Sequence, residues 1–302
     1  MLVSICCLSY NHEKYIAQAV DSFLNQKTDF DIEIIIHDDC STDKSLKILE
    51  EYENKYKGIV RIIRQKENQY SKGKRVLYEY LFPAARGKYI AVCECDDYWI
   101  NPHKLNIQVA YMEKNPDCSL TFTATNILDD KGKTKEFRPS KGEKDFSLAE
   151  IISYPDGGLI PTATMVFKRE LIHEIPSYCW KAPIGDWPLS VYLASKGKVH
   201  YFDFISSVYR FNHPGSWTRN HGKPDQIKYY RKNMMECLIE MMNVFDEPER
   251  ILLKDKYEIQ EYEYWVETGN IVALIKKYYK KILKSPLKNG IRIAYRLVNP
   301  KY

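Results

Sequence analysis

The first half of the chain alternates strand-like and helix-like patterns, and this alternation restricts its fold more than any other feature. Short apolar runs predict strands at residues 2–11, 32–39, 59–63, 89–93 and 119–123, the first two with polar ends. Apolar residues at helical spacing predict helices after Asn11, after Thr42, near 75–85 and over 102–114. This order indicates the α/β class, with a doubly wound, mostly parallel sheet flanked by helices.

The first two helices have clear sequence signals. The helix after Asn11 carries its apolar residues on one stripe, namely Tyr15, Ile16, Ala19, Val20, Phe23 and Leu24. For the second helix, Ser41 or Thr42 is the expected N-terminal cap, because both residue types accept hydrogen bonds from free backbone N–H groups.

Polar residues follow three of the predicted strands at the point where each strand ends. The strand from Leu2 runs to Ser9-Tyr10-Asn11, the strand from Ile32 ends in Asp38 and Asp39, and the strand from Ala91 ends in Glu94-Cys95-Asp96-Asp97. Parallel strands bring their carboxyl ends to one edge of a sheet, where ligands bind in open α/β folds. Carboxylate oxygens are the ligands that Mg²⁺ and Mn²⁺ prefer. For either acidic pair taken alone, a turn of solvated acids is the alternative.

Further motifs accompany these strand ends, and in their order along the chain they resemble the family 2 glycosyltransferases with the GT-A fold. The resemblance rests on Leu8-Ser9-Tyr10-Asn11, His37 to Asp43, Ala85-Arg86-Gly87-Lys88-Tyr89, Glu94 to Leu105 and Gly185-Asp186-Trp187. Members of this group are inverting enzymes that use nucleotide-sugar donors. The resemblance therefore implies a GT-A (Rossmann-like) sheet and transfer of a sugar from a nucleotide diphosphate.

The same resemblance implies which residues bind the donor. The nucleotide-sugar contacts are expected from Leu8, Ser9, Asn11, Asp39 and Asp96. Lys74 is a further candidate for a donor contact. It lies in a basic loop, and the alternative is that this loop is simply solvated. Asp97 is expected to coordinate the Mn²⁺ or Mg²⁺ that bridges the two phosphates. Glu94 takes the first acidic position of the broader Asp-x-Asp pattern. Asp38 is expected to point away from the nucleotide and to form hydrogen bonds within its own turn.

Two later segments supply the candidates for catalysis. Asp186 precedes a helix-like stretch and is the candidate general base, with a helix N-cap as the alternative. Tyr209 to Trp217 resembles a segment that closes over the donor, in which His213 is a candidate metal or phosphate ligand, or plain polar surface. Arg210 or Arg219 would offset diphosphate charge there. The Gln-x-x-Arg-Trp signature of processive members is absent, which favours transfer of a single sugar.

Composition limits the class of protein and its location. The chain has 302 residues, 44% hydrophobic and 28% charged, which is typical of a soluble globular protein. No apolar run approaches the length of a membrane span, so a cytoplasmic protein is expected. The eight cysteines lack the spacing of a zinc site and predict buried thiols in a reducing compartment.

The last third departs from the α/β rhythm and predicts helices at 226–245, 248–265 and 270–283. The expected domains are therefore a catalytic domain, 1–222, and a C-terminal helical extension with a basic tail, 223–302. From Asn270 onward there are nine basic residues and no acid. Such a basic amphipathic helix suits an anionic membrane surface, at the inner face of the cell membrane, or else packs on the catalytic domain. No recognition motif supports nucleic-acid binding.

The sequence thus predicts a metal-dependent inverting glycosyltransferase. Its partners would be a nucleotide-sugar donor, expected to be a UDP-sugar, and a glycan or lipid-linked oligosaccharide acceptor. The reaction would belong to the synthesis of a cell-surface polysaccharide such as lipopolysaccharide, O-antigen or capsule. Two rival hypotheses remain, a nucleotidyltransferase and a non-catalytic scaffold that binds sugar nucleotides. A nucleotidyltransferase would be expected to carry a Gly-rich phosphate loop after the first strand, but this chain has Tyr10 to Lys14 there. The second does not account for Asp39, Asp96, Asp97 and Asp186 being present together.

Overall fold

The structure is a computed structural model that describes residues 2–155, 158–213, 216, 219, 224–270 and 276–277. The chain divides into two compact units. The first comprises Met1–Pro176 and Gly185–Gly215, and the second comprises Ser177–Ile184 and Ser216–Tyr302.

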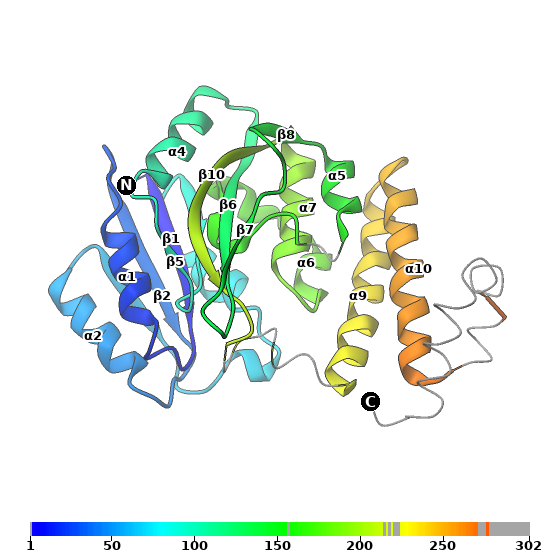
Figure 1. The fold of residues 1–302 in the computed structure, drawn as a ribbon, viewed down its shortest axis with the longest axis horizontal. Helices are drawn as coiled ribbons and strands as arrows, with labels where there is room; N and C mark the ends of the chain where they lie inside the picture. The colour runs from blue at the N-terminus through cyan, green and yellow to red at the C-terminus, as the bar shows by residue number, and fades with distance from the viewer. Residues whose placement is uncertain are drawn as a thin grey trace. The chain divides into compact units, whose positions relative to one another are not determined.

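A mixed β-sheet forms the centre of the first unit, as Figure 1 shows. Its strands are β1 (Val3–Ser9), β2 (Ile32–Asp38), β3 (Val60–Arg64), β4 (Tyr89–Val92), β5 (Tyr98–Trp99), β6 (Cys118–Leu128), β7 (Thr134–Phe137), β8 (Lys144–Phe146), β9 (Val166–Lys168) and β10 (Lys198–Arg210). They follow the order β3-β2-β1-β4-β9-β6-β10-β5, with β7 paired to β6 and β8 paired to β10. The α/β class predicted from the alternation is confirmed.

Parallel pairing holds within two groups of strands. The first group is β3-β2-β1-β4, and the second is β6 with β10. The short strand β9 joins these groups and runs antiparallel to both β4 and β6. The antiparallel strands β5, β7, β8 and β9 were not predicted, because runs of two to four residues carry too little alternation to be recognised.

The helices of the first unit are α1 (Ile16–Leu24), α2 (Ser45–Lys55), α3 (Phe82–Ala84), α4 (Lys104–Lys114), α5 (Leu148–Ser153) and α7 (Asp186–Lys196). Shorter helical turns are η1 (Tyr70–Lys72), η2 (Leu77–Leu81), η4 (Thr162–Thr164) and η5 (Arg169–Glu174). The predicted stripe of α1 is buried as expected, with Ile16, Ala19, Val20 and Phe23 inaccessible to solvent. These side chains pack with β1, β2 and α4 in one apolar core.

The predicted cap of α2 was wrong. The helix begins at Ser45, and Asp43 Oδ1 accepts the hydrogen bond from the Ser45 N–H at 2.9 Å. Ser41 and Thr42 contact the loop after β1 instead: Asn11 N donates to Ser41 Oγ, and Thr42 N donates to the Asn11 side-chain oxygen. The serine and threonine therefore join two strand ends rather than starting a helix.

The cysteine prediction is confirmed for seven of the eight residues. All eight are free thiols, and every one except Cys40 is buried. Cys7 of β1 and Cys95 of the loop between β4 and β5, residues 93–97 and called the acidic loop below, contact each other through their sulfur atoms at 2.9 Å. The buried thiols therefore serve as small core residues, and Cys7 and Cys95 do so at the strand ends.

The second unit is helical and contains α6 (Ser177–Lys181), α9 (Pro224–Val244) and α10 (Glu249–Thr268). Figure 1 shows α9 and α10 side by side, and Arg231 of α9 pairs with Glu267 of α10 at 3.1 Å. The third predicted helix, 270–283, lies outside the described residues except for 270 and 276–277. Within the described part of the chain, no helix has both the length and the apolar character needed to span a membrane.

Candidate active site

The carboxyl ends of three parallel strands meet at one edge of the sheet. Ser9 of β1 is in register with Asp38 of β2, and Cys6 of β1 with Val92 of β4. The loops that follow remain tied to β1, because Asp39 N donates to the Ser9 carbonyl at 3.0 Å and Cys95 N donates to the Leu8 carbonyl at 2.9 Å. Residues more than 80 positions apart in the sequence are thereby neighbours, as expected when the carboxyl ends of parallel strands meet at one edge of a sheet.

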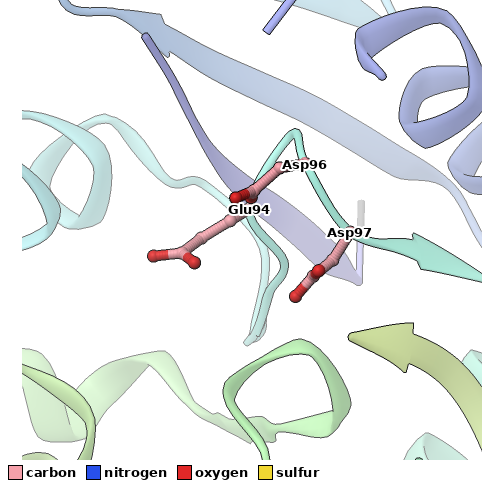
Figure 2. Close-up of side chains that lie close together, drawn as sticks. All are labelled: Glu94, Asp96 and Asp97. Atoms are coloured by element: carbon pink, nitrogen blue, oxygen red, sulfur yellow. The ribbon is translucent and has the colours of Figure 1, made fainter. Parts of the chain in front are cut away.

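Three acidic side chains gather in the loop between β4 and β5. Glu94, Asp96 and Asp97 each offer a carboxylate oxygen, and these oxygens all lie within 4.8 Å of one another. Figure 2 shows the three side chains extending from this loop. Asp96 Oδ1 is buried and has no hydrogen-bond partner in the described part of the protein.

Burial and mutual repulsion shift the titration of this cluster. Burial raises the pKa of Asp97 well above its usual range, and the charges of Asp96 and Glu94 raise it further. Burial, followed by the charges of Asp96 and Asp186, raises the pKa of Glu94 to about 8. A divalent cation would relieve this repulsion, and oxygen-only donors suit Mg²⁺ or Mn²⁺. The residues present therefore fit the ion that the sequence predicted.

Two groups from the end of β10 contact this cluster. His213 Nε2 lies 2.8 Å from Asp96 Oδ2, and the Arg210 backbone N–H donates to Asp97 Oδ1 at 2.8 Å. Although burial acts in the opposite sense, the hydrogen bond from His213 and the nearby His12 lower the pKa of Asp96. His213, a candidate metal or phosphate ligand from the sequence, thus lies beside the acidic cluster.

The two aspartates that follow β2 have different partners. Asp38 Oδ2 accepts the Ser41 N–H at 3.1 Å and so satisfies its own turn. Both carboxylate oxygens of Asp39 accept backbone N–H groups, from Gln69 at 2.7 Å and Tyr70 at 3.0 Å. Asp39 therefore orders the loop after β3, a function that local sequence gave no means of finding because the two segments lie 30 residues apart.

The other predicted donor contacts differ in what they touch. Ser9 Oγ is buried and has no hydrogen-bond partner among the described residues. The Asn11 side-chain oxygen accepts from Thr42, and Lys74 pairs with Glu79 at 3.0 Å on the surface. The Leu8 carbonyl accepts the Cys95 N–H, which joins the first strand to the acidic loop.

Asp186 is the first residue of α7. Its Oδ1 accepts the Trp187 N–H at 2.8 Å, and its Oδ2 accepts the Thr162 hydroxyl at 3.4 Å. Burial raises the pKa of Asp186, and these hydrogen bonds lower it only in part. Its charge is one of the causes that raise the pKa of Glu94, after burial and the charge of Asp96, so the candidate base and the acidic cluster influence each other electrostatically.

A sheet of this kind, with an acidic cluster at the ends of its parallel strands, defines the GT-A class of nucleotide-sugar-binding folds. A solved structure supports the fold: Staphylococcus aureus TarS, residues 1–349, determined in complex with UDP-GlcNAc, matches with a TM-score of 0.69. That likeness covers 100% of this chain and 93% of the TarS chain at 17% sequence identity.

The chain belongs to glycosyl transferase family 2, whose family model matches residues 4–175. An uncharacterised protein of Mycobacterium tuberculosis is 35% identical over 217 residues, which are 71% of this chain and 60% of that protein. The Escherichia coli protein WfaP, a UDP-Glc:alpha-D-GlcNAc-diphosphoundecaprenol beta-1,3-glucosyltransferase, is 32% identical over 72% of this chain and 80% of its own length. The chain thus spans less than two thirds of the mycobacterial relative.

Proposed function

We propose that this chain is an inverting glycosyltransferase that moves one sugar from a UDP-sugar to a hydroxyl group of a glycan or lipid-linked acceptor, assisted by Mn²⁺ or Mg²⁺. The observation that carries the proposal is the cluster of Glu94, Asp96 and Asp97 at the sheet edge that also holds Asp186. WfaP is named for a UDP-sugar donor, and the TarS structure contains one. Both favour UDP as the nucleotide.

Asp97, with Asp96 and His213 beside it, would hold the metal ion. The bound ion would neutralise negative charge on the departing diphosphate. Asp39 and the Ser9 hydroxyl, which has no partner among the described residues, would contact the base and ribose, since they lie at the ends of β2 and β1. The loop that Asp39 orders through Gln69 and Tyr70 would close the nucleotide side of the site.

Asp186 would act as the general base. The acceptor oxygen attacks the anomeric carbon from the face opposite the diphosphate, its proton passes to the Asp186 carboxylate, and the bond from the anomeric carbon to the phosphate oxygen breaks. A carboxylate whose pKa is raised by burial is a stronger base than an exposed one, which suits proton abstraction near neutral pH. Thr162 and the Trp187 N–H fix the direction of this carboxylate.

For the acceptor, we propose a sugar of a bacterial cell-surface polysaccharide, because the E. coli relative is named for a lipid-diphosphate-linked sugar. Such an acceptor would bring the enzyme to a membrane surface. The nine basic and no acidic residues after position 269 suit an anionic surface, and co-sedimentation of the full chain with anionic vesicles checks this point.

The test combines nucleotide binding with turnover. We expect calorimetry to show UDP binding in Mn²⁺ that a chelator reduces to a weak residual level, and Asp97→Asn to bind UDP at that weak level with or without Mn²⁺. Asp186→Asn should keep UDP binding and lose transfer by about 10²–10⁴-fold, the usual contribution of a general base. Asp130→Asn, in the exposed turn between β6 and β7, is the matched control and should change neither property.

Three results would contradict the proposal. Normal transfer by Asp186→Asn would remove the base assignment. Pyrophosphate release from a nucleoside triphosphate would indicate a nucleotidyltransferase. Binding of UDP-sugar without transfer to any acceptor tested, and without slow hydrolysis of the donor, would indicate a scaffold. The anomeric configuration of the product, read by NMR, tests inversion directly.

A further inference from the structure

Arg210, the last residue of β10, has its side chain held between two tyrosine rings. The guanidinium carbon lies 4.7 Å from the centroid of the Tyr15 ring and 4.6 Å from that of the Tyr98 ring. The planar guanidinium can stack on both rings and still direct its N–H groups outward in the plane. The side chain therefore has a fixed position between α1 and β5.

The N–H groups of Arg210 bind the acidic loop and α1. Nη1 donates to the main-chain carbonyl of Asp96, and Nη2 donates to Gln18 Oε1 at 2.5 Å. The backbone N–H of the same residue donates to Asp97 Oδ1 at 2.8 Å. One residue thus fixes both the main chain of Asp96 and the carboxylate of Asp97.

From the sequence, Arg210 or Arg219 was expected to offset charge on the diphosphate. The contacts found here favour another function, because at least two of the guanidinium N–H groups already have acceptors within the protein. The charge also lies against the loop that carries three close carboxylates, where a cation reduces their repulsion. A group that orients a metal ligand in this way typically changes metal affinity by 10–100-fold when it is removed.

We infer that Arg210 is a positioning residue that holds Asp96 and Asp97 in place for the metal ion and so determines how much metal the protein needs to bind its donor. This inference rests on the proposed function, because it requires a metal-dependent nucleotide site. The end of β10 would then support the acidic loop through Arg210. It also leads to His213, three residues further on, which contacts Asp96.

The experiment is a calorimetric titration of the full chain with UDP at stepped Mn²⁺ concentrations and in chelator. For Arg210→Gln, we expect the Mn²⁺ concentration for half-maximal UDP binding to rise about 10–100-fold, with the weak UDP binding in chelator unchanged. Arg210→Lys should shift in the same direction, because an ammonium group cannot stack on two rings and also reach both acceptors. Arg138→Gln, which breaks a surface pair with Asp203, is the control and should leave the Mn²⁺ requirement unchanged.

Gln18→Ala keeps the test decisive if an Arg210 variant fails to fold, as its melting temperature would reveal. It removes only the exposed acceptor of Nη2, and we expect a smaller rise in the Mn²⁺ requirement. An unchanged requirement in the folded variants would overturn the inference while leaving the proposed function intact. Weaker UDP binding in chelator with an unchanged Mn²⁺ requirement would show that Arg210 contacts the diphosphate. UDP binding by the native chain that needs no metal would instead overturn the metal part of the proposed function, and the inference with it.

Discussion

At the scale of single residues, the buried side chain of Lys104, at the start of α4, is expected to make stability depend on pH. Its side chain is fully inaccessible to solvent, and Nζ lies 4.3 Å from the centroid of the Trp99 ring with no hydrogen-bond partner in the described part of the protein. Burial lowers the pKa of Lys104 to about 7, from 10.5. Between these two values the unfolded chain binds a proton that the folded protein lacks, so folding becomes more favourable as the pH rises from about 7 to 10.5.

We therefore predict that Lys104→Met removes this pH dependence. The native protein should gain up to about 1.4 kcal/mol of unfolding free energy per pH unit above pH 7 from this one group, and the variant should not. Below pH 7 the lysine is charged in both states, so the variant should be the more stable protein there. Urea unfolding at pH 6, 7, 8 and 9 measures both effects, and Lys114→Met, exposed on the same helix, is the control. Equal slopes for the native protein and Lys104→Met would contradict the prediction.

At the scale of elements, the turn before β4 shows that a motif shared with a family need not touch the ligand. Gly87 lies so close to β1 that an added Cβ would be 2.6 Å from Ser4 N and 2.8 Å from the Val3 carbonyl carbon. The buried carboxylate of Glu33 on β2 accepts the Ser4 hydroxyl at 2.6 Å and the Arg86 N–H at 2.8 Å. The Arg86-Gly87 pair therefore fixes β4, and with it the acidic loop, against β1 and β2.

Gly87→Ala should accordingly destabilise the protein by about 1–3 kcal/mol, because the added methyl group forces backbone atoms of β1 to move. A lower urea midpoint with an unchanged slope would show this. Gly158→Ala is the matched control, since a Cβ added there meets nothing within 4 Å. If the two variants were equally stable, the close packing of the turn would have no energetic weight.

At the scale of the whole molecule, most of what the sequence patterns predicted depends on neighbouring residues, although the long strand β10 and the capped helix α5 were missed. The stripe of α1 and the strands β1 to β4 follow from local periodicity, and the meeting of the loops after β2 and β4 at the end of β1 follows from parallel strand ends. The start of α2 was mispredicted because Ser41 and Thr42 bind Asn11, a partner 30 or more residues away. Strands of two or three residues, such as β5 and β9, exist only through their pairing with β10, β4 and β6, which no local pattern reveals.

The division of the chain into two compact units predicts which segments ligand binding will stabilise. All the proposed donor and metal contacts lie in the unit formed by residues 1–176 and 185–215, so UDP with Mn²⁺ should slow amide hydrogen exchange in the loop after β4 and at the end of β10. At a free UDP concentration about 100 times its dissociation constant, the free energy of opening these segments should rise by up to about 2.7 kcal/mol. Exchange in α9 should change little, and chelator should reverse the protection. Protection of α9 equal to that of the acidic loop would contradict a donor site confined to the first unit, because the ligand would then stabilise both units alike.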